Sequence, residues 1–225
     1  MRNIIKYKSE IEKLKSVSEY DAVLDNYSNV TIYNTGTWRL LNSKLKNQVK
    51  HLENKPINRN EVFEYYNSYF SGETKDASLP FLVTMLWGFG SNGYGAYRTN
   101  KYLVSEENVQ IINHSFEEMK LHNTSKAYEL LMQIKGLNIS YVSKVLYFAT
   151  KALGIENYTL IFDIRVARAL VEIEAGKEIS SILNITPSDK YEDYVKYNNL
   201  IHRVAKELQT EADSLEMFLF LEGGK

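Results

Sequence analysis

Apolar residues recur every three or four positions along nearly the whole 225-residue chain. This spacing constrains the fold most strongly, because it places apolar side chains on one face of a helix. Residues 78–89 are apolar nearly all round, which predicts a buried central helix. Only 3 prolines and 11 glycines argue against a β-sandwich. We therefore predict an all-α protein, with further helices over 2–24, 37–52, 103–122, 124–135, 178–184, 189–209 and 211–221.

The composition excludes several classes of site. Without cysteine the chain has no disulfide, thiolate zinc site or cysteine nucleophile. The four histidines show no ligand spacing, so we predict no metal and no cofactor; they are His51, His114, His122 and His202. No apolar run reaches about 18 residues, and the N-terminus does not resemble a secretory signal. We therefore expect a cytoplasmic protein without a membrane partner.

The net charge of −1 and the sequence pI of about 6.5 are low for a protein that binds nucleic acid. Any affinity for DNA must therefore come from a local basic face and not from the overall field.

The most unusual segment is "WGFGSNGYGAYR", residues 87–98, in which glycines alternate with aromatic residues. It is open to two interpretations. One is a plain connection between helices. The other is a loop whose backbone approaches a ligand closely, with Arg98 as an anion contact and stacking faces from Trp87, Phe89, Tyr94 or Tyr97. A dinucleotide-binding loop is rejected, since that motif follows a strand and here a helical pattern precedes.

The stretch "IKGLNISYVSKVLYF", residues 134–148, predicts two helices joined by a tight hairpin. Gly136 supplies a positive φ, and Asn138 is the non-glycine residue best suited to a similar conformation. The N-terminus of the second helix then points backbone N–H groups outward, ready for a phosphate. This is the helix-hairpin-helix device for binding DNA. The second helix is predicted to stop at Gly154.

A carboxylate stands at the start of another helical pattern in "LIFDIRVARAL", residues 160–170. Asp163 is a favourable N-cap, because its side chain accepts hydrogen bonds from the first helical turn. A cap held this rigidly is also suited to act as a catalytic acid or base. Arg165 and Arg168 follow one turn later, where they are candidates for the DNA backbone, although Arg168 is equally well placed to pair with Glu172.

Together these motifs resemble the helix-hairpin-helix DNA glycosylases, and among them the bacterial 8-oxoguanine glycosylase (OGG)-like proteins. In that group a hairpin lysine precedes an aspartate by nineteen residues, as Lys144 precedes Asp163. "GLNISYVSKVLYFA", "LWGFGSNGYGAYRT" and the D-x-[HR]-V-x-R pattern in "DIRVAR" stand here in the family's form. The detailed resemblance covers residues 134–172, with weaker support over 86–99.

The hairpin departs from the family pattern at one point. The usual hairpin is Gly-hydrophobic-Gly with the lysine two positions beyond the second glycine, which corresponds to Ser140 here. Lys144 lies one helical turn later. Either the hairpin is longer by about four residues, which we prefer, or Lys144 contacts a phosphate and the nucleophile is missing. An AP-lyase activity is therefore left open.

The resemblance implies a glycosylase-like fold of two closely packed helical lobes with the cleft between them. It implies one functional unit over 1–225, with the hairpin segment at about 124–172. It also implies an enzyme that flips a modified base from double-stranded DNA and cleaves the N-glycosidic bond, leaving an abasic site. The default substrate is oxidised guanine, and a phage-modified base such as glucosylated hydroxymethylcytosine, in phage defence, is the other. No obligate protein partner is evident.

The resemblance assigns catalysis to Asp163 and Lys144. Asp163 stabilises oxocarbenium-like charge on the sugar, and Lys144 attacks C1′ as an amine. The alternative for Lys144 is an ordinary solvated helix lysine. Base-pocket candidates are Trp87, Phe89, Tyr94 and Trp38. DNA-backbone candidates are Gly136, Asn138, Ser140, Ser143, Arg165, Arg168 and Arg98. The rival classes are a non-catalytic helix-hairpin-helix module and a helical bundle that binds a small molecule.

Overall fold

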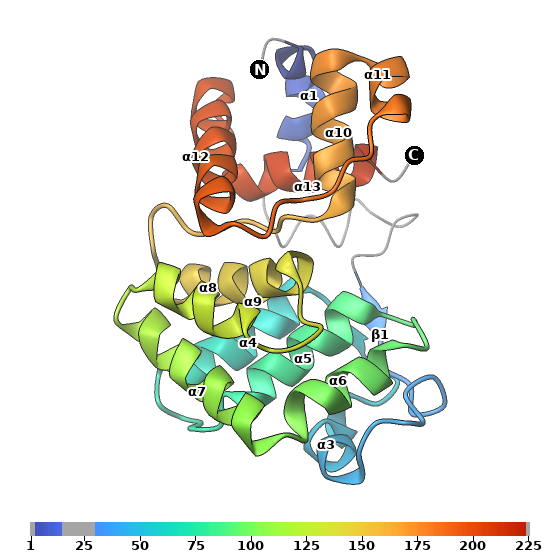
Figure 1. Ribbon diagram of the computed structural model, residues 1–225, viewed down its shortest axis with the longest axis vertical. Coiled ribbons are helices and arrows are strands. Elements are labelled where there is room, and N and C mark those ends of the chain that lie inside the picture. The colour runs from blue at the N-terminus through green and yellow to red at the C-terminus, as the bar shows by residue number, and fades with distance from the viewer. Residues whose placement is uncertain (1–2, 15–29, 224–225) are drawn as a thin grey trace. The chain divides into compact units, whose positions relative to one another are not determined.

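The computed structural model describes residues 3–14 and 30–223 of the chain. Regular structure in these residues is almost entirely helical (Figure 1). The exception is one short antiparallel pair of strands, β1 (Thr31–Ile32) and β2 (Pro56–Ile57). The predicted all-α class is therefore confirmed. Within the described ranges, no helix has both the length and the apolar character needed to cross a membrane.

The chain divides into two compact units, Ser28–Tyr158 and Met1–Tyr27 with Thr159–Lys225. We call them the central unit and the terminal unit. That residues 1–225 act as a single functional unit stays a prediction.

The central unit is a helical bundle built around α5 (Ser78–Phe89), which contacts α4, α6, α7 and α9. Ten of the twelve residues of α5 are buried, so the predicted central helix is confirmed. The other elements of this unit are α3 (Ser43–Gln48), the short 3-10 helix η2 (Lys50–Leu52), α4 (Arg59–Phe70), α6 (Gly95–Leu103), α7 (Glu106–Lys120), α8 (Thr124–Met132) and α9 (Ile139–Ala152).

The helix predicted over 37–52 is shorter than its apolar spacing suggested, because α3 begins only at Ser43. The side chain of Asn42 caps α3 by accepting a hydrogen bond from the backbone N–H of Lys44. The backbone N–H of Asn42 is bound in turn by the Asn100 side chain of α6, at 2.8 Å. The side-chain amide nitrogen of Asn100 also donates a hydrogen bond to the carbonyl of Leu40. These bonds from α6 hold the preceding residues in turns, which local periodicity does not reveal.

The terminal unit is built around α13 (Ala212–Glu222), which packs against α1, α10 and α12. Its other elements are the 3-10 helix η1 (Ile4–Tyr7), α1 (Lys8–Glu12), α10 (Ile164–Ala175), α11 (Lys177–Ile182) and α12 (Tyr191–Leu208). The helix predicted over 2–24 is helical from 4 to 12, and its part over 15–24 lies outside the described residues. The predicted C-terminal helices agree closely with α12 and α13 (Figure 1).

Candidate active site

The hairpin between α8 and α9 forms at the position that the sequence predicts. Gly136 has a φ of 92°, a conformation that favours glycine. The hydroxyl of Tyr102 in α6 donates a hydrogen bond to the Gly136 carbonyl, at 2.7 Å, which ties the turn to the bundle. The prediction for Asn138 is wrong, since its φ of −117° and ψ of 172° are extended. An extended residue before a helix is the usual N-cap conformation, so only one left-handed residue is needed in this hairpin.

Lys144 lies on α9, and its amine returns to the start of that helix. The lysine is only 7% exposed. Its Nζ donates to the Ser140 carbonyl oxygen at 3.0 Å and to the Ser140 hydroxyl at 3.1 Å. Because α9 already begins at Ile139, the expectation of a hairpin longer by about four residues is wrong. The long side chain spans the extra turn instead and delivers the amine to Ser140, the position where the family pattern has its lysine.

Two neighbours shape the space around Lys144. A Cβ atom at Gly88 in α5 would lie 3.2 Å from Lys144 Cδ and 3.3 Å from Tyr141 Cε1, so the missing side chain makes room for the lysine stem. The ammonium lies 5.2 Å from the centroid of the Tyr141 ring, within cation–π distance. Tyr141 in turn stacks on Phe89, with centroids 4.2 Å apart. Sequence reasoning missed Tyr141, although its position three residues before Lys144 on one helix was a usable signal.

The glycine-rich segment is mostly helix and not an extended loop. Gly88 and Gly95 belong to α5 and α6, and only residues 90–94 connect them. The indole N–H of Trp38 donates to the Gly90 carbonyl at 3.1 Å. A Cβ atom at Gly95 would lie 2.8 Å from Phe89 Cβ and 2.9 Å from Trp38 Cη2, so the absence of a side chain at Gly95 permits the close approach of these two residues.

The predicted base-pocket residues occupy different environments. Trp38 and Phe89 are buried and meet edge to face at 6.5 Å. Trp87 is buried too, against Phe148 at 5.3 Å. Only Tyr94 is open to solvent, at 73% exposed. As they are placed, the three buried rings are core residues that support the segment around Lys144, and stacking by them on a flipped base stays a prediction.

Asp163 is the N-cap of α10, as predicted. Its φ of −130° and ψ of 177° are extended, and Oδ1 accepts a hydrogen bond from the backbone N–H of Arg165 at 2.8 Å. The residue is 9% exposed. Arg165 and Arg168 are both exposed on α10. The guanidinium of Arg165 lies 4.9 Å from the Phe220 ring centroid in α13, within cation–π distance.

The remaining DNA-backbone candidates differ in exposure. Gly136, Asn138 and Arg98 are exposed, and Ser140 is half-buried. Ser143 is fully buried, and its hydroxyl donates to the Ser140 carbonyl at 3.2 Å. That placement fits support of the turn that carries Ser140 better than direct contact with a phosphate.

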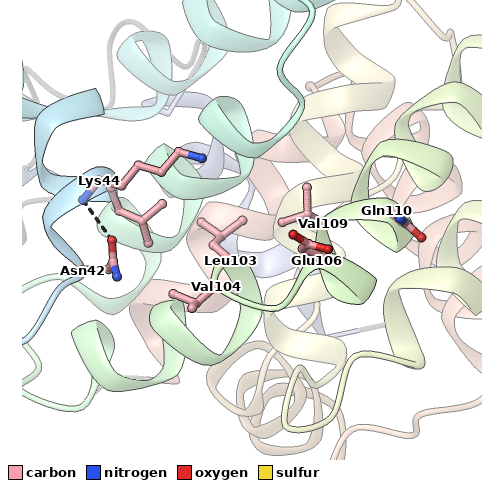
Figure 2. Close-up of a pocket in the computed structure, with 8 residues that line it drawn as sticks. Asn42, Lys44, Leu103, Val104, Glu106, Val109 and Gln110 are labelled. Carbon is pink, nitrogen blue, oxygen red and sulfur yellow. Dashed lines mark hydrogen bonds between the residues drawn. The ribbon is translucent and has the colours of Figure 1, made fainter.

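A pocket of about 410 Å³ lies elsewhere in the central unit, between the start of α3 and the α6–α7 junction (Figure 2). Figure 2 shows the lining residues, which are Asn42, Lys44, Leu45, Leu103, Val104, Glu106, Val109 and Gln110. None of the predicted base-pocket residues lines it.

The structure thus contains the glycine hairpin, the lysine on the following helix and the helix-capping aspartate nineteen residues beyond it, on which the resemblance to helix-hairpin-helix DNA glycosylases rests. The family model described as "Putative 8-oxoguanine DNA glycosylase OGG-like protein" matches residues 26–220. The chain therefore belongs to this OGG-like family, as the sequence predicted. Neither the search of curated proteins nor the search of solved structures found a match.

Proposed function

We propose that the protein is a DNA glycosylase, which takes a modified base out of the duplex and cleaves its N-glycosidic bond to leave an abasic site. Membership of the OGG-like family supports both DNA as the substrate and this class of reaction. The observation that carries the proposal is the buried amine of Lys144, held at Ser140 beside the helix-hairpin-helix turn. Most lysines are exposed, and a chain gains little from burying one unless the amine has a task.

The proposed role of Asp163 is electrostatic. When the bond between C1′ and the base breaks, positive charge develops on the deoxyribose, as in glycoside hydrolysis generally. A carboxylate already fixed as a helix cap stabilises that charge without having to reorganise during the reaction. An ionised carboxylate accepts more than one hydrogen bond, so its bond from the Arg165 N–H is compatible with a role in orienting an attacking water.

The proposed role of Lys144 is nucleophilic. The nitrogen lone pair adds to C1′, the C1′–N bond to the base breaks, and its electron pair leaves with the base, which takes up a proton. Loss of a proton from nitrogen and opening of the sugar ring give a Schiff base, and water hydrolyses it to the abasic site. The attacking amine must be deprotonated. Lys144 belongs to the central unit and Asp163 to the terminal unit, so each role is proposed and tested separately.

Two substrates are proposed in order of support. Oxidised guanine comes first, because the family description names it. A phage-modified base such as glucosylated hydroxymethylcytosine comes second, in an enzyme of phage defence. The net charge of −1 favours it slightly, because an enzyme that scans a whole genome gains from a strong positive field.

The test is release of free base, read by mass spectrometry, from oxidised bacterial DNA and from heavily modified phage DNA. Asp163→Asn keeps a good helix cap but loses the charge, since asparagine and aspartate cap about equally well. Lys144→Met removes the amine. Borohydride reduction converts a Schiff base into a stable protein–DNA adduct, which shows whether the Schiff base forms. Lys8→Met, on the surface of α1, is the matched control for the loss of one positive charge.

The expected result is base release by the unmutated protein and by Lys8→Met, with only a low residual rate of release by Asp163→Asn. A trapped protein–DNA adduct that disappears in Lys144→Met supports the nucleophile. If no DNA loses a base while the unmutated protein and Asp163→Asn bind it equally, the chain is a non-catalytic helix-hairpin-helix module. Affinity without dependence on salt contradicts DNA binding through the backbone altogether.

A further inference from the structure

The extended segment immediately before the candidate catalytic aspartate is held by side chains of α12. Leu160 donates its backbone N–H to the side-chain oxygen of Asn198, at 2.6 Å. The Leu160 carbonyl accepts from the Tyr194 hydroxyl at 2.7 Å, and the Ile161 carbonyl accepts from the Tyr197 hydroxyl at 2.8 Å. One helix thus satisfies three polar backbone groups of two neighbouring residues that belong to no helix or sheet. We call Tyr194, Tyr197 and Asn198 the α12 clamp.

The members of the α12 clamp are pre-arranged by their own helix. Their spacing of three and four residues puts them on one face of α12. All three are buried, at 0%, 6% and 8% exposed. The Asn198 amide also donates to the Tyr194 carbonyl at 2.7 Å, which turns its oxygen toward the Leu160 N–H. Buried polar side chains require partners, and here the partners are the segment that leads to Asp163.

The side chain next to the aspartate is fixed as well. The ring of Phe162 stacks on Tyr197, with centroids 4.4 Å apart and planes at 19°, and lies nearly parallel to Tyr194 at 6.4 Å. Upstream, therefore, the α12 clamp fixes residues 160–162. Downstream, Asp163 is fixed by its bond from Arg165 in α10. The carboxylate has two independent supports.

We propose that Tyr194, Tyr197 and Asn198 are positioning residues, which set the location of the Asp163 carboxylate and thereby the rate of base release. This inference rests on the proposed function. The effect of an electrostatic stabiliser depends on the position of its charge relative to the reacting atoms. A misplacement of about 1 Å can lower the rate roughly 100-fold. Buried backbone groups such as those of Leu160 and Ile161 need partners in any fold, so an effect on base release that depends on the Asp163 carboxylate is what distinguishes a positioning role.

The experiment measures single-turnover base release and DNA affinity with the full-length protein. Tyr197→Phe and the double variant Tyr194→Phe/Tyr197→Phe remove hydroxyls but keep the rings, so the stacking on Phe162 survives. Each change is made in the unmutated protein and in Asp163→Asn, which forms a double-mutant cycle. The control is Tyr66→Phe, which removes another buried hydroxyl bond, to Thr84 in the central unit, at 2.9 Å.

We expect the double variant to release base about 10- to 100-fold more slowly with unchanged DNA affinity. The same substitutions should have no effect on the residual rate of Asp163→Asn, and Tyr66→Phe should keep the full rate. If the double variant is as fast as Tyr66→Phe, or is slowed equally in both backgrounds, the inference fails and the proposed function stands. No release by the unmutated protein from any DNA overturns the proposed function itself.

Discussion

Replacement of Gly88 by alanine separates activity from stability in a way that the structure makes specific. Gly88 lies in the last turn of α5, and an added Cβ would stand 3.2 Å from Lys144 Cδ and 3.3 Å from Tyr141 Cε1. Both distances are shorter than ordinary van der Waals contact, so the neighbours must yield by a few tenths of an ångström. The Lys144 stem is the more flexible neighbour, and its movement pulls the amine from its two bonds with Ser140.

The expected magnitudes follow from two opposing effects on stability. Alanine is favoured over glycine in a helix by up to about 1 kcal/mol, less near a helix end. Overpacking against the lysine costs about 1 kcal/mol. The free energy of unfolding should therefore change by less than about 1 kcal/mol. Base release depends on where the amine stands, and a shift of a few tenths of an ångström should slow it roughly tenfold, given about 100-fold for 1 Å.

The assay is single-turnover base release beside thermal unfolding of the same preparations. Gly93→Ala is the matched control, because a Cβ at Gly93 would meet nothing within 4 Å. We expect Gly93→Ala to keep the rate and Gly88→Ala to lose most of it at similar melting temperature. Equal rates for the two variants would refute the argument that the lysine stem needs the space at Gly88.

Two further predictions concern the central unit. Tyr102→Phe should lower the free energy of unfolding by about 1 kcal/mol and weaken DNA binding, because the Gly136 carbonyl loses its 2.7 Å bond and the hairpin loosens; urea unfolding and a DNA titration measure this, and unchanged affinity would count against the hairpin as the DNA contact. Hydrogen bonds from Lys120 and Tyr69 hold the pKa of Glu117 below its usual value of 4.5, so its contribution to stability is present above that pH and is lost as the pH falls through the lower folded-state pKa. Glu117→Gln should therefore reduce stability slightly at pH 7 and progressively less as the pH falls below 4.5, and a difference that is independent of pH would contradict the assignment.

Local chemistry was enough to predict several elements of this protein. The helix α5 is apolar on every face, so it must be surrounded by other elements to bury its side chains, and its central position was evident from the sequence. Asp163 caps α10 because a carboxylate before a helical pattern meets the free N–H groups of the first turn. Gly136 turns the hairpin because few other residues adopt a positive φ. Each of these outcomes depends on neighbours within about one helical turn.

Asn138 and the helix predicted over 37–52 show the limit of local reasoning. Asn138 tolerates a left-handed conformation, but one such residue already closes the turn, and the position before α9 requires an extended one. The apolar spacing over 37–52 continues past the true start of α3, where Asn100 from α6 binds the backbone first. In both places a compatible local preference was overruled by a geometric requirement that the local sequence does not contain.

The sequence by itself determined the helical class, the hairpin, the capping aspartate and the lysine nineteen residues before it. Only the tertiary structure decided that Gly88 in α5 leaves the space in which the Lys144 side chain lies, and that α12 holds the backbone leading to Asp163. The physical reason is range. Helix formation and capping depend on interactions between residues a few positions apart in the sequence. The contacts of Gly88 and of α12 join residues tens of positions apart, and they form only when the helices pack against one another.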